Sequence, residues 1–338
     1  MKSIVILAIE SSCDETSAAV AIDGKILSNT VATQKVHERY GGVVPELASR
    51  AHQKHIVPVV EEALKKAGVS KRELSAVAFT QGPGLLGSLM VGASFAKGLA
   101  LSLDIPLIGV QHMQAHILAH FIDEPKPSFP FLCLTVSGGH TQLVLVKDYL
   151  DMEIVGETQD DAVGEAFDKA AKLLGLGYPG GPLVDKYAQE GNPHAFEFPD
   201  VATEGLNFSF SGIKTAFLYF LQDHLKTNPR FMEENLADIC ASFQESLLKI
   251  LLSKLKRAAK TYGVSHVGIA GGVSANSSLR KKLKELGEKM NWKTYIPDFQ
   301  YCTDNAGMIA ITAHYQYLHG KFATQHTIPD ARLKFLSS

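Results

Sequence analysis

The chain has 338 residues, enough for two domains of ordinary size, and its 46% hydrophobic and 20% charged residues are typical of a folded globular protein. This composition excludes a disordered chain, a collagen and a coiled coil. The 33 basic and 35 acidic residues give a net charge of −2. Any polyanionic partner must therefore contact a local basic patch.

The cysteines and the apolar segments bear on the compartment. The four cysteines lie far apart and form no CxxC pair, which argues against a disulfide framework and a thiolate zinc site and favours a reducing cytoplasm. The apolar run 4–9 ends at Glu10 without a cleavage site, so we do not expect an export signal. The apolar stretch Leu85–Leu103 contains Lys97 and several glycines, which favours a buried core helix over a membrane span.

One hairpin pattern occurs twice along the chain. The first copy covers residues 3–22 with a polar turn at 10–16, and the second covers residues 131–146 with a small-residue turn at 137–141. This duplication predicts two related lobes, and a cleft between them in which both turns face one ligand.

The segment between the two hairpins and the segments after them suggest the organisation of the chain. Residues 123–130 are rich in proline and have the composition of a linker, so we place the boundary between the lobes there. Further on, the periodicity predicts helices at 161–174 and 236–262 and a strand at 266–270. The sequence thus predicts an α/β fold with mixed sheets.

The segment Gly82–Gly87 matches the GxGxxG pattern and lies between a predicted strand and a predicted helix, as in dinucleotide-binding proteins. However, the carboxylate expected after the next strand is missing, and Pro83 removes one N–H donor. A tight structural turn is therefore the favoured interpretation.

Three histidines, His112, His116 and His120, recur every four residues and so share one face of a predicted helix. Two adjacent imidazoles suit zinc, iron or another transition metal, provided that a third ligand comes from elsewhere. Ordinary core or surface histidines would have the same spacing. Asp304 is either that missing carboxylate ligand or the N-cap of a helix.

Several other segments combine small residues with a polar side chain. Asn276 ends the turn 270–276 and could contact a base or a ribose, although a helix cap would have the same sequence. Asp168 and Asp185 suit a ribose hydroxyl, although acidic residues near a helix start are also favoured by the helix dipole. Cys13 has no histidine nearby in sequence, which favours a buried thiol over a nucleophile.

Eight segments in order resemble a single family. They are residues 9–16, residues 40–50, the pair His112 and His116, residues 136–142, 164–169, 209–214 and 271–276, and the pair Asp304 and Asn305. Together they resemble the bacterial TsaD branch of the tRNA N6-adenosine threonylcarbamoyltransferase family, over residues 4 to 312.

The resemblance implies a two-lobed actin-like fold of the ASKHA superfamily, a duplicated RNase H-like fold with a cleft between the lobes. The first lobe would comprise residues 1–130, completed by C-terminal helices at 304–338, and the second lobe would comprise residues 131–303 with a helical insertion. The implied reaction moves the threonylcarbamoyl group from threonylcarbamoyl-AMP to the exocyclic N6 amine of the adenosine 3′-adjacent to the anticodon. The substrates are tRNAs that read ANN codons, and AMP is released.

The family's site residues correspond to positions in this sequence. The metal ligands, for iron or zinc, correspond to His112, His116 and Asp304, and His120 is treated as incidental. The substrate contacts correspond to Thr135, Val136, Ser137, Gly138, Gly139, Asp168, Gly181, Asp185 and Asn276. Asp14 or Glu15 could assist the weakly nucleophilic amine, and the choice between them stays open.

A mechanism follows from the chemistry of the implied substrate. The carbamoyl–phosphate anhydride is already activated, so the enzyme has to hold it, polarise it and stabilise the departing phosphate. A divalent metal would act as a Lewis acid on its oxygens, and backbone N–H groups of the turn 137–139 would meet the same anion.

Two other functions fit the same fold. The first is an ATP-dependent phosphotransferase or ATPase of the actin-like superfamily, in which turn carboxylates hold magnesium. The imidazoles argue against it, because magnesium prefers oxygen ligands. The second is a regulatory nucleotide-binding scaffold, which would tolerate loss of the metal ligands.

The resemblance also implies partners. They are the tRNA, an upstream synthase that makes threonylcarbamoyl-AMP, and the companion proteins TsaB and TsaE; neither a membrane nor DNA is expected. An apolar surface of the first lobe is the expected docking face, with residues 88–101 as weak candidates. The basic segments 249–260 and 281–284 could meet tRNA phosphates, although solvated helix faces have the same composition.

Overall fold

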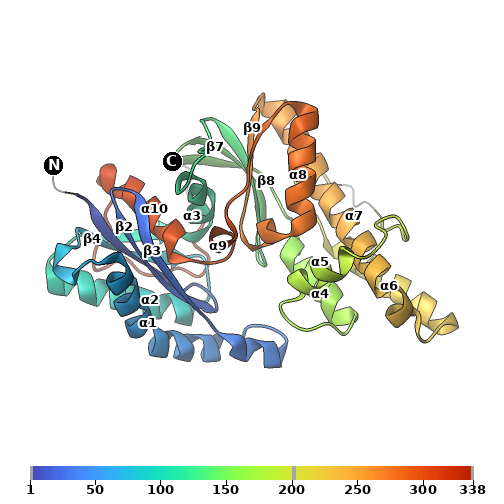
Figure 1. The fold of residues 1–338 in the computed structure, drawn as a ribbon, viewed down its shortest axis with the longest axis horizontal. Helices are drawn as coiled ribbons and strands as arrows, with labels where there is room; N and C mark the ends of the chain where they lie inside the picture. Colours follow the sequence, from blue (N-terminus) through green and yellow to red (C-terminus); the bar gives the residue numbers. More distant parts are fainter. Residues whose placement is uncertain (1–2, 200–202, 336–338) are drawn as a thin grey trace. The chain divides into compact units, whose positions relative to one another are not determined.

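The structure is a computed structural model that describes residues 3–199 and 203–335. It consists of two compact units, each built around one five-stranded sheet (Figure 1). The first unit comprises Met1–Pro127, Asp148–Met152 and Pro297–Ser338, and the second comprises Ser128–Lys147 and Glu153–Ile296.

The sheet of the first unit has the strand order β3-β2-β1-β4-β5. Its strands are β1 (Val5–Glu10), β2 (Glu15–Ile22), β3 (Lys25–Thr33), β4 (Ala76–Gly82) and β5 (Leu107–Gln111). The first three form an antiparallel meander, and β4 and β5 continue the sheet parallel to β1. The α-helices of this unit are α1 (Pro45–Ala67), α2 (Leu86–Leu103), α3 (His112–Leu118), α9 (Phe299–Cys302) and α10 (Ala306–Leu318). Three short 3₁₀ helices cover Lys35–Tyr40, Lys71–Glu73 and Ala119–Phe121.

Both faces of this sheet are covered, so its central strand β1 is apolar from Val5 to Ile9. Successive side chains of a strand point to opposite faces. Leu7 and Ile9 of β1 accordingly pack with residues of α1 and α2. Ile6 and Ala8 pack with residues of α3 and α10 on the other face. The core of the first unit therefore needs α10, although α10 is nearly 300 residues beyond β1 in the chain.

The second sheet has the order β10-β9-β6-β7-β8 and repeats the topology of the first. Its strands are β6 (Phe131–Val136), β7 (Thr141–Asp148), β8 (Asp151–Glu157), β9 (His266–Ala270) and β10 (Lys293–Tyr295). Its helices are α4 (Val163–Leu173), α5 (Gly180–Ala188), α6 (Ser211–Thr227), α7 (Phe231–Tyr262), the 3₁₀ helix Gly272–Ala275 and α8 (Ser277–Met290). The antiparallel pairs β1–β2 and β6–β7 are the two predicted hairpins. The predicted α/β class with mixed sheets is confirmed.

Most of the predicted elements differ from the observed ones only at their ends. The strand at 266–270 is β9, and the helix predicted at 161–174 is α4. The helix predicted at 236–262 begins earlier, at Phe231, because a first turn joins it across Asn235, whose backbone is not helical.

Helix α2 is long and apolar enough to cross a membrane by length and composition, and 33% of that stretch is buried. One of its faces packs on β4 and α1, with Leu89 and Ala93 buried. Its other face exposes Leu86, Met90 and Leu101 at 51%, 52% and 69%. The prediction of a buried core helix is therefore right for one face of α2 and wrong for the other.

The connection from β7 to β8 belongs to the first unit. Asp148–Met152 groups with the first unit, although the limits inferred from the sequence assign it to the second lobe. Within this segment Tyr149 stacks on Tyr315 of α10, with ring centroids 3.7 Å apart, and also contacts Phe121. The lobe limits themselves stay a prediction.

Candidate metal centre and substrate turns

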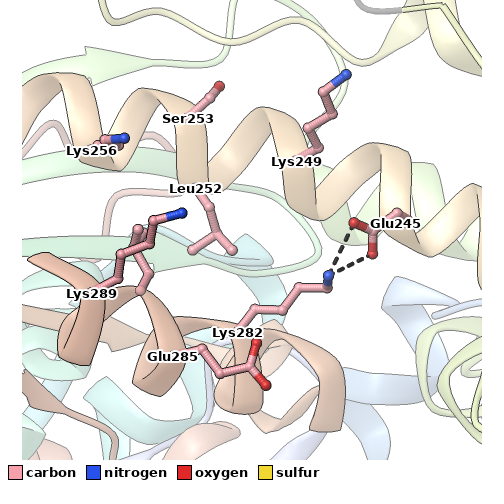
Figure 2. A pocket seen from close by; sticks show the side chains of 9 residues that line it. Glu245, Lys249, Leu252, Ser253, Lys256, Lys282, Glu285 and Lys289 are labelled. Atoms are coloured by element: carbon pink, nitrogen blue, oxygen red, sulfur yellow. Dashed lines mark hydrogen bonds and ion pairs between the residues drawn. The ribbon is translucent and has the colours of Figure 1, made fainter.

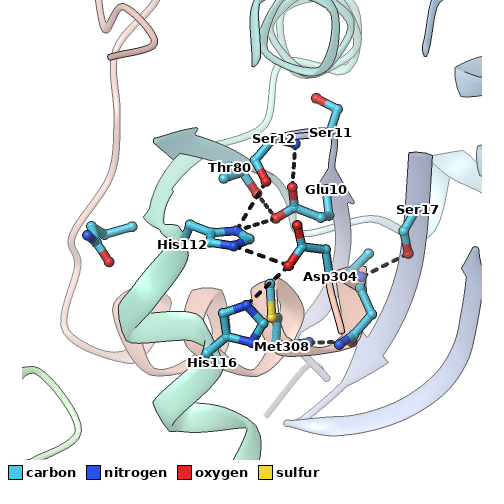
Figure 3. Close-up of polar contacts among 12 residues, drawn as sticks. Glu10, Ser11, Ser12, Ser17, Thr80, His112, His116, Asp304 and Met308 are labelled. Carbon is cyan, nitrogen blue, oxygen red and sulfur yellow. Dashed lines mark hydrogen bonds and ion pairs between the residues drawn. The ribbon is translucent and has the colours of Figure 1, made fainter. Parts of the chain in front are cut away.

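Two histidines and one aspartate converge in the first unit. The Nε2 atoms of His112 and His116 lie 3.3 and 3.2 Å from Oδ1 of Asp304 (Figure 3). One ligand atom from each residue lies within 4.8 Å of the other two. His120 is also buried but is not part of this group. Two imidazole nitrogens and one carboxylate oxygen are a common three-residue set for a transition metal, and they leave a further coordination position for substrate or water.

Helix α3 places the two histidines. It begins at His112, directly after β5, and His116 follows one turn later on the same side. Its start is fixed by Gln111, whose side-chain oxygen accepts a hydrogen bond of 2.7 Å from the backbone N–H of Gln114. The rings of His112 and His116 meet edge to face, with centroids 4.7 Å apart.

Asp304 comes from the segment just before α10. The N-cap of α10 is Asn305, whose side-chain oxygen accepts a hydrogen bond of 3.1 Å from the N–H of Met308. The cap role considered for Asp304 therefore belongs to its neighbour. The Asp304 carboxylate is left outside the helix, where it faces the two histidines.

Behind His112 lies a carboxylate that the sequence analysis missed. Glu10, the last residue of β1, is fully buried, and its Oε2 lies 3.0 Å from Nδ1 of His112. The same oxygen accepts a 2.6 Å hydrogen bond from the Thr80 hydroxyl, and Oε1 accepts one from the backbone N–H of Ser12. A carboxylate that receives Nδ1–H fixes the tautomer of a metal-ligating histidine and leaves Nε2 as the ligand atom. The available signal in the sequence was an acidic residue at the end of an otherwise apolar strand.

The electrostatics of this cluster favour a cation. Burial opposes protonation of His112, but the carboxylates of Asp304 and Glu10 outweigh it and raise the pKa of His112 well above its usual value. Burial alone would raise the pKa of Asp304, yet the nearby His112 holds it far below its usual value. Burial lowers the pKa of His116, whose Nδ1 has no hydrogen-bond partner among the described residues. The buried carboxylate of Glu10 and the partly buried one of Asp304 thus favour positive charge beside them, and the donor set fits a divalent transition metal.

The turn that carries Asp14 and Glu15 is held from two helices. The ring of His52, on α1, contacts the Thr16 hydroxyl at 2.8 Å and the carbonyl oxygen of Cys13 at 2.9 Å. The Ser88 hydroxyl, on α2, donates to the same carbonyl at 3.3 Å. Burial, followed by the carboxylates of Asp304 and Asp14, raises the pKa of Glu15 to about 10. Burial also raises the pKa of the Cys13 thiol, which argues against a thiolate nucleophile there.

The backbone of the GxGxxG segment and the residue before it form hydrogen bonds with residues 330 and 331 near the end of the chain. The N–H of Gly84 donates to the carbonyl of Ala331 at 3.3 Å, and the N–H of Asp330 donates to the carbonyl of Gln81 at 2.8 Å. Gly82 has φ of +154°, and a Cβ there would collide with the backbone of Asp330. These contacts support the interpretation as a structural turn.

The small-residue turn of the second hairpin packs against the start of α4, where the N–H of Gly164 donates to the Ser137 carbonyl oxygen at 3.2 Å. Thr135 and Val136 end β6 and lead into Ser137, Gly138 and Gly139. A Cβ at Gly164 of α4 would lie 2.5 Å from the Ser137 carbonyl oxygen, whereas nothing lies within 4 Å of a Cβ at Gly138 or Gly139. The turn is therefore held in place by α4 at Ser137, and the space around Gly138 and Gly139 is open.

The other substrate-site candidates lie in the second unit, and the three polar ones among them bind the first turns of helices. Asp168 accepts hydrogen bonds from the N–H groups of Gly180 and Gly181, at 2.8 and 3.3 Å. Asp185 accepts from both the N–H and the hydroxyl of Ser277 at 2.9 Å. Burial raises the pKa of Asp168.

Asn276 has a similar structural role. Its side-chain oxygen caps α8 through the N–H of Leu279 at 2.9 Å, and its amide donates to Gln244 at 2.6 Å. Asn276 therefore has the helix-cap role that its sequence context also allows. Contacts of these residues with a substrate stay predictions.

Comparison with known proteins gives the family. Residues 25–311 match the family model described as TsaD, tRNA N6-adenosine threonylcarbamoyltransferase. A relative of that name from Christiangramia forsetii is 62% identical over 99% of both chains. Another of that name, from Cytophaga hutchinsonii, is 62% identical over 98% of this chain and 97% of its own. The chain belongs to the TsaD family.

Solved structures support the fold class of this TsaD-family chain. Full-length HypF matches with a TM-score of 0.62 and 14% identity, over 95% of this chain and 47% of HypF. Component A of (R)-2-hydroxyglutaryl-CoA dehydratase from Acidaminococcus fermentans matches with a TM-score of 0.55 and 14% identity, over 93% of this chain and 99% of its own. At such identities the likeness establishes the fold alone, which is the predicted actin-like ASKHA class.

Proposed function

We propose that this chain transfers the threonylcarbamoyl group from threonylcarbamoyl-AMP to the N6 amine of the adenosine 3′-adjacent to the anticodon, in tRNAs that read ANN codons, and that AMP is released. Membership of the TsaD family supports the reaction class. The observation that carries the proposal is the convergence of His112, His116 and Asp304 on one point, with Glu10 buried behind them. A phosphotransferase that depends on magnesium would not need two imidazoles.

His112, His116 and Asp304 would hold one divalent ion, iron or zinc. When bound, the ion would supply Lewis acidity toward the carbamoyl and phosphate oxygens of the substrate. Glu10 would keep the proton of His112 on Nδ1, and so leave the lone pair of Nε2 for the ion that Asp304 also binds. Ser12 and Thr80 hold Glu10 in place through the two hydrogen bonds that its oxygens accept.

The second unit would bind the adenylate. The turn of Ser137, Gly138 and Gly139 follows Thr135 and Val136. The N–H of Ser137 is already donated to the carbonyl oxygen of His140, so the N–H groups of Gly138 and Gly139, around which the space is open, are the ones that would meet the phosphate. Asp168, Gly181, Asp185 and Asn276 would hold the sugar and the base of the adenylate. We keep residues 1–130 with 304–338, and residues 131–303, as the proposed limits of those lobes.

Asp14 and Glu15 are candidates to assist the attacking amine, and only an ionised carboxylate can take the proton that the amine loses. Because the pKa of Glu15 is raised to about 10, Glu15 holds its own proton near neutral pH, which favours Asp14 for this role. Both lie at the turn that His52 and Ser88 hold, so their backbone is fixed by two helices. The amine is weakly nucleophilic, and a carboxylate within reach of its proton would assist the attack.

The proposed partners follow from the reaction. A synthase must form threonylcarbamoyl-AMP from threonine, bicarbonate and ATP, and the bacterial branch of the family implies TsaB and TsaE as companions. The exposed Leu86, Met90 and Leu101 of α2 are the apolar residues that we assign to a companion's docking face. We place this activity in the cytoplasm, where its tRNA substrate is found.

Nucleoside analysis tests the proposed function. An unmodified ANN-reading tRNA is incubated with the protein, its companions, the synthase, threonine, bicarbonate and ATP, and is then digested. Threonylcarbamoyl-adenosine is expected with the wild type and not with His112→Ala/His116→Ala. If the double variant formed as much threonylcarbamoyl-adenosine as the wild type, the metal would not be needed for transfer. Absence of the product, with ATP consumed beyond the synthase's own turnover, would favour an ATPase.

A further inference from the structure

Positive charge is concentrated in two helices of the second unit. The segment 246–262 of α7 and the helix α8 contain ten of the chain's 33 basic residues but two of its 35 acidic residues. The basic residues are Lys249, Lys254, Lys256, Arg257, Lys260, Arg280, Lys281, Lys282, Lys284 and Lys289. The remainder of the chain is consequently acidic. In a protein with a net charge of −2, such segregation indicates a polyanionic partner.

Four of these lysines line one hollow between α7 and α8, which has a volume of about 330 Å³ (Figure 2). Lys249 and Lys256 are two turns apart on α7, and Lys282 and Lys289 are two turns apart on α8. Two turns correspond to about 10.5 Å along a helix. The hollow is also lined by Leu252, Ser253 and Leu286, and by the acidic residues Glu245 and Glu285.

Three of the four lysines are available to a ligand. Lys282 is neutralised by Glu245, whose two oxygens lie 3.0 and 2.8 Å from its Nζ. Lys249, Lys256 and Lys289 are exposed, and none of them forms an ion pair with another described residue. By contrast, Lys254 is already bound to the carbonyl oxygens of Thr203 and Gly205. We call Lys249, Lys256 and Lys289 the basic face.

The chemistry of the basic face fits a phosphate backbone. Lysine ammonium groups on flexible stems act as point charges toward phosphates and do not read base edges, unlike the planar fork of arginine. A membrane surface would need bulky apolar side chains beside the lysines. Among the described residues, Tyr262 is the exposed large hydrophobic residue on this half of α7, and α8 carries none.

We propose that the basic face binds the sugar-phosphate backbone of the tRNA substrate. The proposal rests on the proposed function, because it takes the polyanion to be the tRNA that is modified. Contacts of this kind supply affinity and orientation but no sequence information. The face therefore serves all ANN-reading tRNAs alike.

The test compares two variants with equal charge changes. Lys249→Gln/Lys256→Gln/Lys289→Gln removes the basic face, and Lys25→Gln/Lys65→Gln/Lys71→Gln removes three exposed lysines of the first unit. The full-length protein with its companions is titrated with an unmodified ANN-reading tRNA over a range of salt concentrations. We expect the first variant to bind at least about tenfold more weakly and to lower the slope of log Kd against log salt by about 2 to 3. The control variant should match the wild type, and circular dichroism should show both variants folded.

The outcomes separate this proposal from the proposed function. An unchanged Kd and salt slope in the first variant, or an equal loss in the control variant, would overturn the proposal. The proposal would also be overturned if the first variant lost binding to phosphatidylglycerol vesicles but still bound tRNA as the wild type does. If the wild type forms no threonylcarbamoyl-adenosine, the proposed function fails whether or not the basic face binds tRNA. If it does form the product, the first variant should raise KM for tRNA and leave kcat nearly unchanged.

Discussion

The Nδ1 atom of His112 lies 3.0 Å from Oε2 of Glu10, and the carboxylate of Glu10 has no exposure to solvent. A hydrogen bond of this kind orients a ligating imidazole and increases its basicity. The Glu10→Gln variant keeps the volume of the side chain but loses the charge. We expect it to bind zinc or iron about 10- to 100-fold more weakly, measured by competition with a chelator. The exposed Glu46→Gln is the control, and equal affinities in all three proteins would argue against a supporting role for Glu10.

The ligand set makes a separate prediction. His116→Ala and Asp304→Asn should each lose metal content and transfer activity together, the activity by more than about 100-fold, because a lost ligand costs more than a lost supporting group. His120→Asn should keep its metal, since His120 is not in the converging group. Metal analysis of the purified variants decides the point. A metal-free Asp304→Asn variant with full transfer activity would contradict the mechanism.

We expect a side chain at position 164 to destabilise the protein, because Gly164 packs closely against the turn of the second hairpin. A Cβ at this position would lie 2.5 Å from the Ser137 carbonyl oxygen and 2.9 Å from Cα of Gly138, and neither backbone atom can rotate away. Gly164→Ala should lower the free energy of unfolding by about 1 to 3 kcal/mol and should raise KM for threonylcarbamoyl-AMP.

Gly98→Ala is the matched control for this substitution, because nothing lies within 4 Å of its Cβ on α2. This control should raise the free energy of unfolding by up to about 1 kcal/mol through helix propensity. Urea unfolding compares the two variants with the wild type. Equal stabilities for Gly164→Ala and the wild type would show that the turn can move away without cost.

We expect the stability of the protein to depend on pH through the protonation of His52. Burial lowers the pKa of His52 below its usual value, and the Cys13 carbonyl and the charges of Glu10 and Asp14 oppose this only in part, while His55 adds to it. In the unfolded chain the pKa is about 6.5, so the unfolded state binds the proton first as the pH falls. The contribution of neutral His52 is therefore complete above about pH 6.5 and is lost as the pH falls toward the folded-state pKa.

The measurement is urea unfolding of the wild type and of His52→Gln between pH 5 and pH 8. At pH 8 the variant should be less stable by about 1 to 3 kcal/mol, because it loses the hydrogen bonds to Thr16 and Cys13. That difference should shrink at lower pH. A difference that stays constant over this range would show that His52 does not titrate between the folded and unfolded states.

Local patterns predicted local features of this structure well. The hairpins β1–β2 and β6–β7 follow from alternating apolar segments around turn residues, and the pairing of His112 with His116 follows from helix spacing. No local pattern indicates the third member of the group, because Asp304 is 188 residues from His116. The resemblance to a family supplied it.

Two features lay wholly or partly outside sequence reasoning for physical reasons. Glu10 was missed because its function depends on burial and on partners 70 and 102 residues away, namely Thr80 and His112. The exposed face of α2 was indicated only weakly, through the docking candidates 88–101, because small and apolar residues on all sides of a helix leave no contrast between a buried face and an exposed one.

The first unit closes with α10, and this has a consequence for the order of folding. Residues from Phe131 to Ile296 of the second unit leave the ribosome before α10, so its sheet can form during synthesis. The first unit can complete its core only after α10 has been synthesised, because Ile309 and other residues of α10 pack against Ile6 and Ala8. Asp304 arrives with the same segment. A nascent chain that ends before Pro297 would therefore carry both histidines on a half-covered sheet, a state that a chaperone would have to protect from aggregation.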